Sequence, residues 1–310
     1  MTLSPTFQKI VFVILLLICM LPFINAPMAL ILGFVMVNVM GNPYKEYSSK
    51  AVKWLLKASI VGLGFGMNFY SAINAGKDSL ILTVSTIVLV LALGYVIGRM
   101  LNIEQKTSYL VSSGTAICGG SAIAAVSPII DADPKQISVA LGTVFILNAV
   151  ALLIFPVIGH YFELSQYQFG LWSAIAIHDT SSVVGAASAY GEEALKIATT
   201  VKLGRALWII PLSIFTILIN KKGKKGIDIP YFIGFFILTM LISTFVPQFK
   251  PLYDIIVAIS KQALVVTLFL IGAGLSFAVI KSTGAKTFIQ GLSLWIIISI
   301  VSLATIMYFY

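Results

Sequence analysis

Apolar residues form long continuous runs along the chain, and short polar connectors separate these runs. A membrane-spanning helix needs about 20 mostly apolar residues. The runs do not alternate between apolar and polar positions, which favours helices over a β-barrel. We therefore predict an all-α polytopic membrane protein with a single membrane domain over residues 1–310. Its roughly 11 transmembrane helices are expected at 10–25, 27–41, 54–73, 79–99, 107–130, 137–160, 166–190, 194–219, 231–247, 255–280 and 286–310.

The composition supports lipid as the solvent for much of this surface. Hydrophobic residues make up 59% of the chain, charged residues make up 10%, and the mean hydropathy is +1.03. A soluble domain carries about 25% charged residues. The formal net charge is +9, but the basic residues lie in short connectors, so they indicate membrane topology and not a nucleic-acid partner.

The distribution of lysine and arginine predicts the orientation. With a cytoplasmic N-terminus and eleven crossings, thirteen of the 20 basic residues face the cytoplasm, including the "KKGKK" run at 221–225. Five face outside, and Lys202 and Arg205 fall within a predicted helix. The excess predicts a multi-pass membrane protein with a cytoplasmic N-terminus and an external C-terminus.

The N-terminal segment and the cysteines add two expectations. Lys9, an apolar run and "INAP" resemble a signal peptide, but another apolar segment follows at once, which favours a retained first helix. Cys19 and Cys118 both lie in apolar runs and show neither a disulfide framework nor metal-ligand spacing. We expect no metal and no cofactor.

Ionisable side chains at membrane depth are costly and indicate function. The run "AIAIHDTSSVVG" places His178, Asp179, Thr180 and Ser181 near the middle of the predicted helix 166–190. The next predicted helix carries Lys202 and Arg205, which are three residues apart and share one helix face. Asp179 can pair with one cation, and the remaining positive charge suits an anionic ligand.

Structural roles for the same residues stay open at this point. Asp179 and Arg205 can staple the bundle, Lys202 can extend to the membrane surface, and His178 can be an ordinary interior histidine. Asn148 fits helix–helix contact, and Cys118 fits a small apolar filler.

The stretch "GTAICGGSAIAA" at 114–125 predicts an interrupted helix. Gly119 and Gly120 weaken the helix, and unwound backbone at membrane depth is tolerated where it is buried in protein or lines a cavity. The N–H groups that begin the second half, with the Ser121 hydroxyl, can bind an anion. The alternative is that these glycines allow close helix packing.

Two short internal similarities hint at a repeat. "VGLGFGMNF" at 61–69 resembles "IGAGLSFAV" at 271–279, and "AICGGSAI" at 116–123 resembles "AIHDTSSV" at 176–183. Inverted repeats with discontinuous helices are typical of secondary transporters. The two similarities imply different registers.

The longer motifs "GTAICGGSAIAAVSPII" and "FGLWSAIAIHDTSSVVGAASAYGEEALKIATTVKLGRALWIIPL" resemble the YeiH family of bacterial inner-membrane proteins, whose family label proposes sulfate export. The resemblance implies distant kinship with bile acid/sodium symporters and sodium/proton antiporters. It departs from the family at "HDTSS", where relatives tend to have "HDTAQ", so it assigns no role to Ser182.

The kinship implies two inverted five-helix repeats that form a panel domain and a core domain, with two broken helices that cross. An extra first helix at 1–26 and repeats at about 27–160 and 166–310 would fit eleven helices. On that scheme the breaks lie near Cys118–Gly120 and near Gly272–Gly274, with Ser276 as a supporting polar residue.

The leading hypothesis is a secondary active transporter of a small anion, sulfate or an organic sulfonate, coupled to H⁺ or Na⁺. The ligand would be held by Lys202, Arg205, Thr180, Ser181 and the segment Gly119–Ser121, with His178 and Asp179 handling the coupling ion. The alternative is a sodium/proton antiporter-like cation transporter with Asp179 as the ion carboxylate. An intramembrane enzyme would need a nucleophile and a base, for which the chain offers only His178 with Ser181 or Cys118, so we do not expect an enzyme. A homodimer remains an open expectation.

Overall fold

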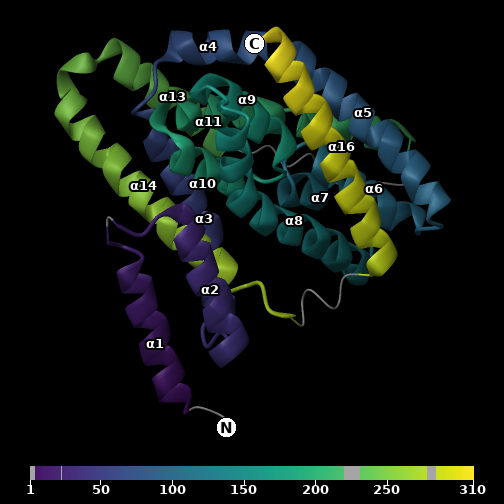
Figure 1. Cartoon of the computed structure of the whole chain (residues 1–310), viewed down its shortest axis with the longest axis horizontal. Coiled ribbons are helices and arrows are strands. Elements are labelled where there is room, and N and C mark those ends of the chain that lie inside the picture. Colours follow the sequence, from purple (N-terminus) through teal and green to yellow (C-terminus); the bar gives the residue numbers. More distant parts are fainter. Residues whose placement is uncertain (1–3, 22, 220–230, 278–283) are drawn as a thin grey trace. The chain divides into compact units, whose positions relative to one another are not determined.

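The computed structural model describes residues 4–21, 23–219, 231–277 and 284–310. The secondary structure in these ranges is helical, as predicted (Figure 1). The "KKGKK" run at 221–225 lies outside the described residues.

Two compact units make up the chain. The first contains Met1–Asn74 and Tyr231–Phe277, and the second contains Ala75–Pro230 and Ala278–Tyr310. Each unit therefore takes segments from both halves of the sequence. The predicted repeat boundaries and their register remain predictions.

The first unit is built from five α-helices and one 3₁₀ turn in its described part. They are α1 (Pro5–Ile18), α2 (Ala26–Met40), α3 (Lys45–Gly64), α13 (Phe232–Phe245), η1 (Pro247–Phe249) and α14 (Lys250–Gly272). The helix α4 (Phe69–Asp78) crosses the boundary between the units. The predicted span 54–73 is therefore wrong in its bounds, since α3 ends at Gly64 and a turn precedes α4.

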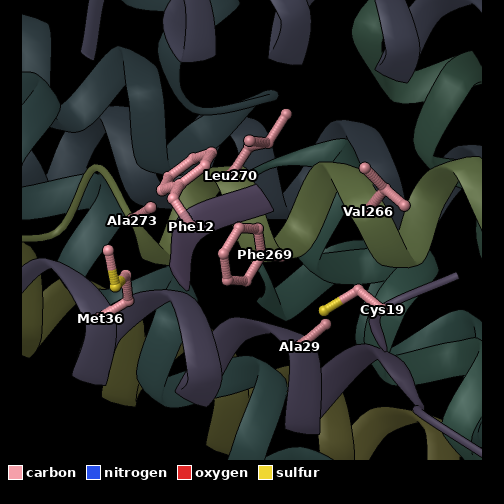
Figure 2. Close-up of a cluster of buried hydrophobic side chains, with 8 residues drawn as sticks. All are labelled: Phe12, Cys19, Ala29, Met36, Val266, Phe269, Leu270 and Ala273. Carbon is pink, nitrogen blue, oxygen red and sulfur yellow. The ribbon is translucent and has the colours of Figure 1, made fainter. Parts of the chain in front are cut away.

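Apolar side chains from α1, α2 and α14 form the core of the first unit. Figure 2 shows this cluster, which consists of Phe12, Cys19, Ala29, Met36, Val266, Phe269, Leu270 and Ala273. Phe12 meets Phe269 edge-on at 5.3 Å between ring centroids. In a membrane such helix–helix contacts stabilise the fold by van der Waals packing, because lipid is as apolar as these side chains.

Glycines bring α2 and α14 into backbone contact. A Cβ on Gly33 would overlap the Phe269 carbonyl, and a Cβ on Gly272 would overlap the Leu30 carbonyl. After α14 ends, Asn38 Nδ2 donates to the Leu275 carbonyl at 3.2 Å and Asn38 Oδ1 accepts from the Phe277 N–H at 2.8 Å. The glycines thus serve close packing, and an asparagine of α2 satisfies the polar backbone that follows them.

The second unit contains nine of the described helices in full. They are α5 (Leu80–Met100), α6 (Gln105–Ala116), α7 (Gly120–Val126), α8 (Pro134–Tyr161), α9 (Gln166–Ala176), α10 (Thr180–Tyr190), α11 (Glu192–Ala206), α12 (Ile209–Ile219) and α16 (Ala285–Phe309). The last helix, α16, packs against α5, α6, α8 and α9; in Figure 1 it is the yellow helix beside the blue α5.

Buried polar contacts join α5, α6 and α16 within the second unit. Gln290 Nε2 donates to the Gly94 carbonyl at 3.0 Å and to the Ser108 hydroxyl at 2.7 Å. A Cβ on Gly94 or Gly98 would overlap a serine of α6. Small residues and interhelical hydrogen bonds are the usual means of packing helices in a membrane.

Five described helices are long and apolar enough to cross a membrane, at Leu80–Met100, Lys135–Tyr161, Glu192–Ile219, Pro247–Gly272 and Ala285–Phe309. Three shorter helices are also apolar. The predicted spans 107–130 and 166–190 are each divided into two short helices by an interruption. These two interruptions form the candidate site.

Candidate functional site

The first interruption lies between α6 and α7, where the paired glycines predict one. The helix α6 ends at Ala116, and Gly119 is the N-cap residue before α7, with φ 66° and ψ −123°. This is a backbone conformation that side chains disfavour, so a glycine belongs there. The Gly119 N–H donates to the Gly114 carbonyl at 2.8 Å, and no side chain caps α7.

The second interruption lies between α9 and α10, so the prediction of one continuous helix over 166–190 is wrong. The helix α9 ends at Ala176, and the backbone is extended at Ile177 and Asp179. Neither glycine nor proline marks this place. Side-chain hydrogen bonds stabilise it instead, because Asn148 Oδ1 on α8 accepts from the N–H groups of His178 at 3.0 Å and Asp179 at 3.3 Å.

Asp179 caps the N-terminus of α10. Its Oδ1 accepts from the Ser182 N–H at 2.9 Å, and its Oδ2 accepts from the Ser181 hydroxyl at 2.7 Å. Aspartate is a preferred N-cap because its carboxylate satisfies a free N–H and meets the positive end of the helix dipole. The run "HDTSS" carried this signal, which a reading of the segment as one continuous helix missed.

The two interruptions are in contact within the second unit. A Cβ on Gly119 would lie 3.2 Å from the Cβ of Asp179 and 3.2 Å from Val144 Cγ1 on α8. The similar stretches 116–123 and 176–183 therefore coincide with two helix interruptions that touch. Gly272, Gly274 and Ser276 belong to the first unit, and the crossing of a break there with the break at Gly119 stays a prediction.

Two fully buried cations on α11 bind the carbonyl ends of the interrupted helices. Lys202 Nζ donates to the carbonyls of Ile177 at 2.6 Å and Ala174 at 3.2 Å. Arg205 Nε donates to the Ala116 carbonyl at 2.9 Å. Each cation thus meets the negative C-terminal end of one helix, α9 or α6, where terminal carbonyls have no partner within the helix.

Arg205 also reaches α5. Its Nη1 donates to the Thr86 hydroxyl at 2.9 Å. Thr86 was absent from the sequence-based candidates, and nothing in the sequence around it distinguishes it from other helical threonines. Lys202 is also buried in the protein, so it does not extend to the membrane surface, which was one of the alternatives open from the sequence.

The expected ion pair between Asp179 and a cation is absent from the described residues. Asp179 binds the start of α10, whereas Lys202 and Arg205 bind carbonyl groups. The prediction failed because it counted charged side chains and left out the helix ends that two interruptions create. Those ends carry partial charges of about half an elementary charge each.

Several buried polar atoms around the interruptions lack a hydrogen bond of good geometry. They are Arg205 Nη2, Asn148 Nδ2 and both ring nitrogens of His178. The backbone of Val144 is a polar neighbour of the His178 ring. An unsatisfied buried polar group costs about 1–3 kcal/mol, so a cluster of them points to a polar ligand or water that completes the site.

The other sequence-predicted residues lie around this centre. Cys118 is buried, with the hydroxyl of Ser121 and the backbone of Ala122 as its polar neighbours. Ser121 is exposed, and Gly120, Asp179 and Thr180 are partly exposed. No group of three or more histidine, cysteine or acidic residues in the described ranges could hold a metal ion.

Comparison with known proteins then places the chain in a family. The family described as conserved hypothetical protein 698 matches residues 10–291. A UPF0324 membrane protein of Shewanella oneidensis is 49% identical over 302 residues, which cover 97% of this chain and 96% of the relative. The chain belongs to the UPF0324 family of membrane proteins. This confirms the resemblance to YeiH-like proteins.

Other members of the UPF0324 family are similarly close. The relative from Bacteroides thetaiotaomicron is 52% identical over 285 residues, covering 91% of this chain and 86% of the relative. The relative from Geobacter sulfurreducens is 46% identical over 295 residues, covering 95% of each chain. No solved structure matches. These names establish a membrane protein and give no substrate.

Proposed function

We propose that this protein is a secondary active transporter of a small oxyanion, with its binding site where the two helix interruptions meet. The observation that carries the proposal is the pair of buried cations, Lys202 and Arg205, without an ion-paired carboxylate in the described chain. Buried charge is costly unless it is compensated.

A count of local charges supports an anion. The C-terminal ends of α6 and α9 and the N-terminal ends of α7 and α10 contribute partial charges of opposite sign that cancel. Lys202, Arg205 and Asp179 then leave a surplus of about one positive charge. One small anion would neutralise it.

Donor groups around the interruptions support an oxyanion. A guanidinium donates only, and Arg205 Nη2 is not used by the protein. Asn148 Nδ2 is likewise a donor without a partner. The helix α7 has seven residues, so we assign its N-terminal N–H groups and Ser121 a supporting role, and Arg205 the main one.

The fold supports alternating access. Interrupted helices are typical of transporters, in which the irregular backbone holds the substrate. The described chain also divides into two compact units, and alternating access in such transporters is largely the movement of one bundle against another. The sequence-based cation alternative is less well supported, because the buried cations Lys202 and Arg205 would repel a second cation at this site.

Thermal unfolding of the purified protein tests this proposal. The panel contains sulfate, sulfite, methanesulfonate, a small carboxylate and sodium as the chloride and gluconate salts. An oxyanion should raise the melting temperature, because a ligand at a hundred times its Kd adds about 2.7 kcal/mol of stability. Stabilisation by sodium with either counterion, and by no oxyanion, would instead support the cation alternative.

A further inference from the structure

His178 is a titratable group of the site whose side chain the protein does not hold by hydrogen bonds of good geometry. Its ring is 1% exposed, and neither nitrogen makes a hydrogen bond of good geometry. Its backbone is fixed by Asn148. The ring can therefore gain a proton without breaking a hydrogen bond that stabilises the interruption.

Charged groups of both signs lie around this ring. Lys202 and Arg205 on α11 both act on it electrostatically. Asp179 follows it in the chain, and Cys118 lies in the connection that touches Asp179 through Gly119. The helix α8 faces this centre with Asn148 and Val144, which carry no charge.

A bound anion changes this balance. The site has a surplus of about one positive charge, so a monoanion leaves it neutral, whereas a dianion leaves it with about one negative charge. A proton on His178 would restore neutrality and turn both ring nitrogens into donors. Binding of a dianion and binding of the proton then favour each other by the same factor.

We propose that His178 takes up one proton when a doubly charged oxyanion binds, so that dianion and proton are carried together while a monoanion binds alone. The inference rests on the proposed function. It assigns the coupling proton to His178 and makes Asp179 a positioning residue that caps α10. Arg205 cannot supply the exchangeable proton, because its guanidinium stays charged.

Calorimetry of the full chain in two buffers of different protonation enthalpy tests the proposal. The probes are sulfate and methanesulfonate, which share a tetrahedral head and differ by one charge. We expect about one proton taken up per sulfate and none per methanesulfonate. Sulfate affinity should then fall by about tenfold per pH unit between the pKa of His178 in the free site and its pKa in the sulfate complex, whereas methanesulfonate affinity should stay nearly constant.

The variant His178→Gln locates the proton, since glutamine keeps polar groups and cannot titrate. We expect it to take up no proton and to bind sulfate at least about tenfold more weakly, with methanesulfonate binding within about threefold of wild type. His160→Gln is the matched control, because His160 is the second of the two histidines and lies exposed against Tyr190. It should behave as wild type.

The outcomes separate the two proposals. If neither anion binds the wild-type protein, the proposed function is wrong and the inference falls with it. If both anions bind with equal proton counts in wild type, only the inference is overturned, even if His178→Gln does not fold. Unchanged proton uptake in His178→Gln would also overturn it and assign the proton to Lys202 or Cys118.

Discussion

The two helix interruptions of the second unit differ in what stabilises them. Between α6 and α7, Gly119 supplies a left-handed backbone, and no side chain caps α7. Between α9 and α10, Asn148 binds the extended backbone and Asp179 caps α10. The helices that precede the interruptions, α6 and α9, end in the same way, because a C-terminal carbonyl of each accepts a hydrogen bond from a cation of α11.

This comparison shows how one site can be built from two unrelated sequence signals. A glycine pair permits one interruption, and a polar run with an N-cap produces the other. The common element is α11, where a spacing of three residues places Lys202 and Arg205 one turn apart. Both oxygens of the Asp179 carboxylate hydrogen-bond to the start of α10 and so stabilise the fold. The Arg205 guanidinium, in contrast, has one nitrogen, Nη2, without a hydrogen-bond partner in the protein.

The largest expected effect is the loss of anion binding in Arg205→Ala. Truncating one side of a buried charged hydrogen bond costs about 2–5 kcal/mol, so affinity should fall at least about thirtyfold. Arg205→Lys should recover little of it, because an ammonium cannot present the same fork of donors. The control is Arg99→Ala, since Arg99 is the other arginine of the chain and its side chain lies over the Tyr95 ring on α5. This variant should leave the affinity unchanged in a titration of the purified protein.

The next effect is a stability loss in Gly119→Ala. A side chain at φ 66° and ψ −123° is strained by about 1–3 kcal/mol, and its Cβ would press on Asp179 and Val144. Gly120→Ala is the matched control, because the atoms nearest to its Cβ would be those of Leu141 and Phe145 at ordinary contact distances of 3.4–3.5 Å. Thermal unfolding of both variants should show the loss at position 119 alone. Equal stability would mean that the first interruption does not depend on its glycine conformation.

A smaller loss is expected at the second interruption in Asp179→Ala. Removal of an N-cap costs about 0.5–2 kcal/mol. Asp179→Asn should cost less, since asparagine caps equally well, and it should keep anion binding. Abolished transport in a well-folded Asp179→Asn protein would show that the negative charge itself is needed, as in the cation alternative.

The smallest expected effect is the coupling between Asp179 and Arg205. They bind different groups in the structure, so the stability losses of Asp179→Ala and Arg205→Ala should add within about 0.5 kcal/mol. A double variant more stable than Arg205→Ala alone would indicate an ion pair between them, contrary to the contacts described above.

The fold class was predictable because long apolar runs leave few alternatives in lipid. The break at Gly119 was predictable for a related reason, since paired glycines weaken a helix. The break at Ile177–Asp179 was not, because Asn148 supports it from 30 residues away in the sequence. Lys202 and Arg205 were identifiable as cations within a predicted membrane helix. Their carbonyl partners were not, because those carbonyls become free only when the helices end.

Exchange of radiolabelled sulfate across a membrane tests the central claim most directly. Proteoliposomes loaded with unlabelled sulfate would receive a trace of labelled sulfate outside, with methanesulfonate as competitor. We predict that wild-type liposomes accumulate the label, that methanesulfonate slows this accumulation, and that Arg205→Lys liposomes of equal protein content do not exceed protein-free liposomes. Accumulation by Arg205→Lys at the wild-type rate, or none by the folded wild-type protein, would contradict an oxyanion site at Arg205.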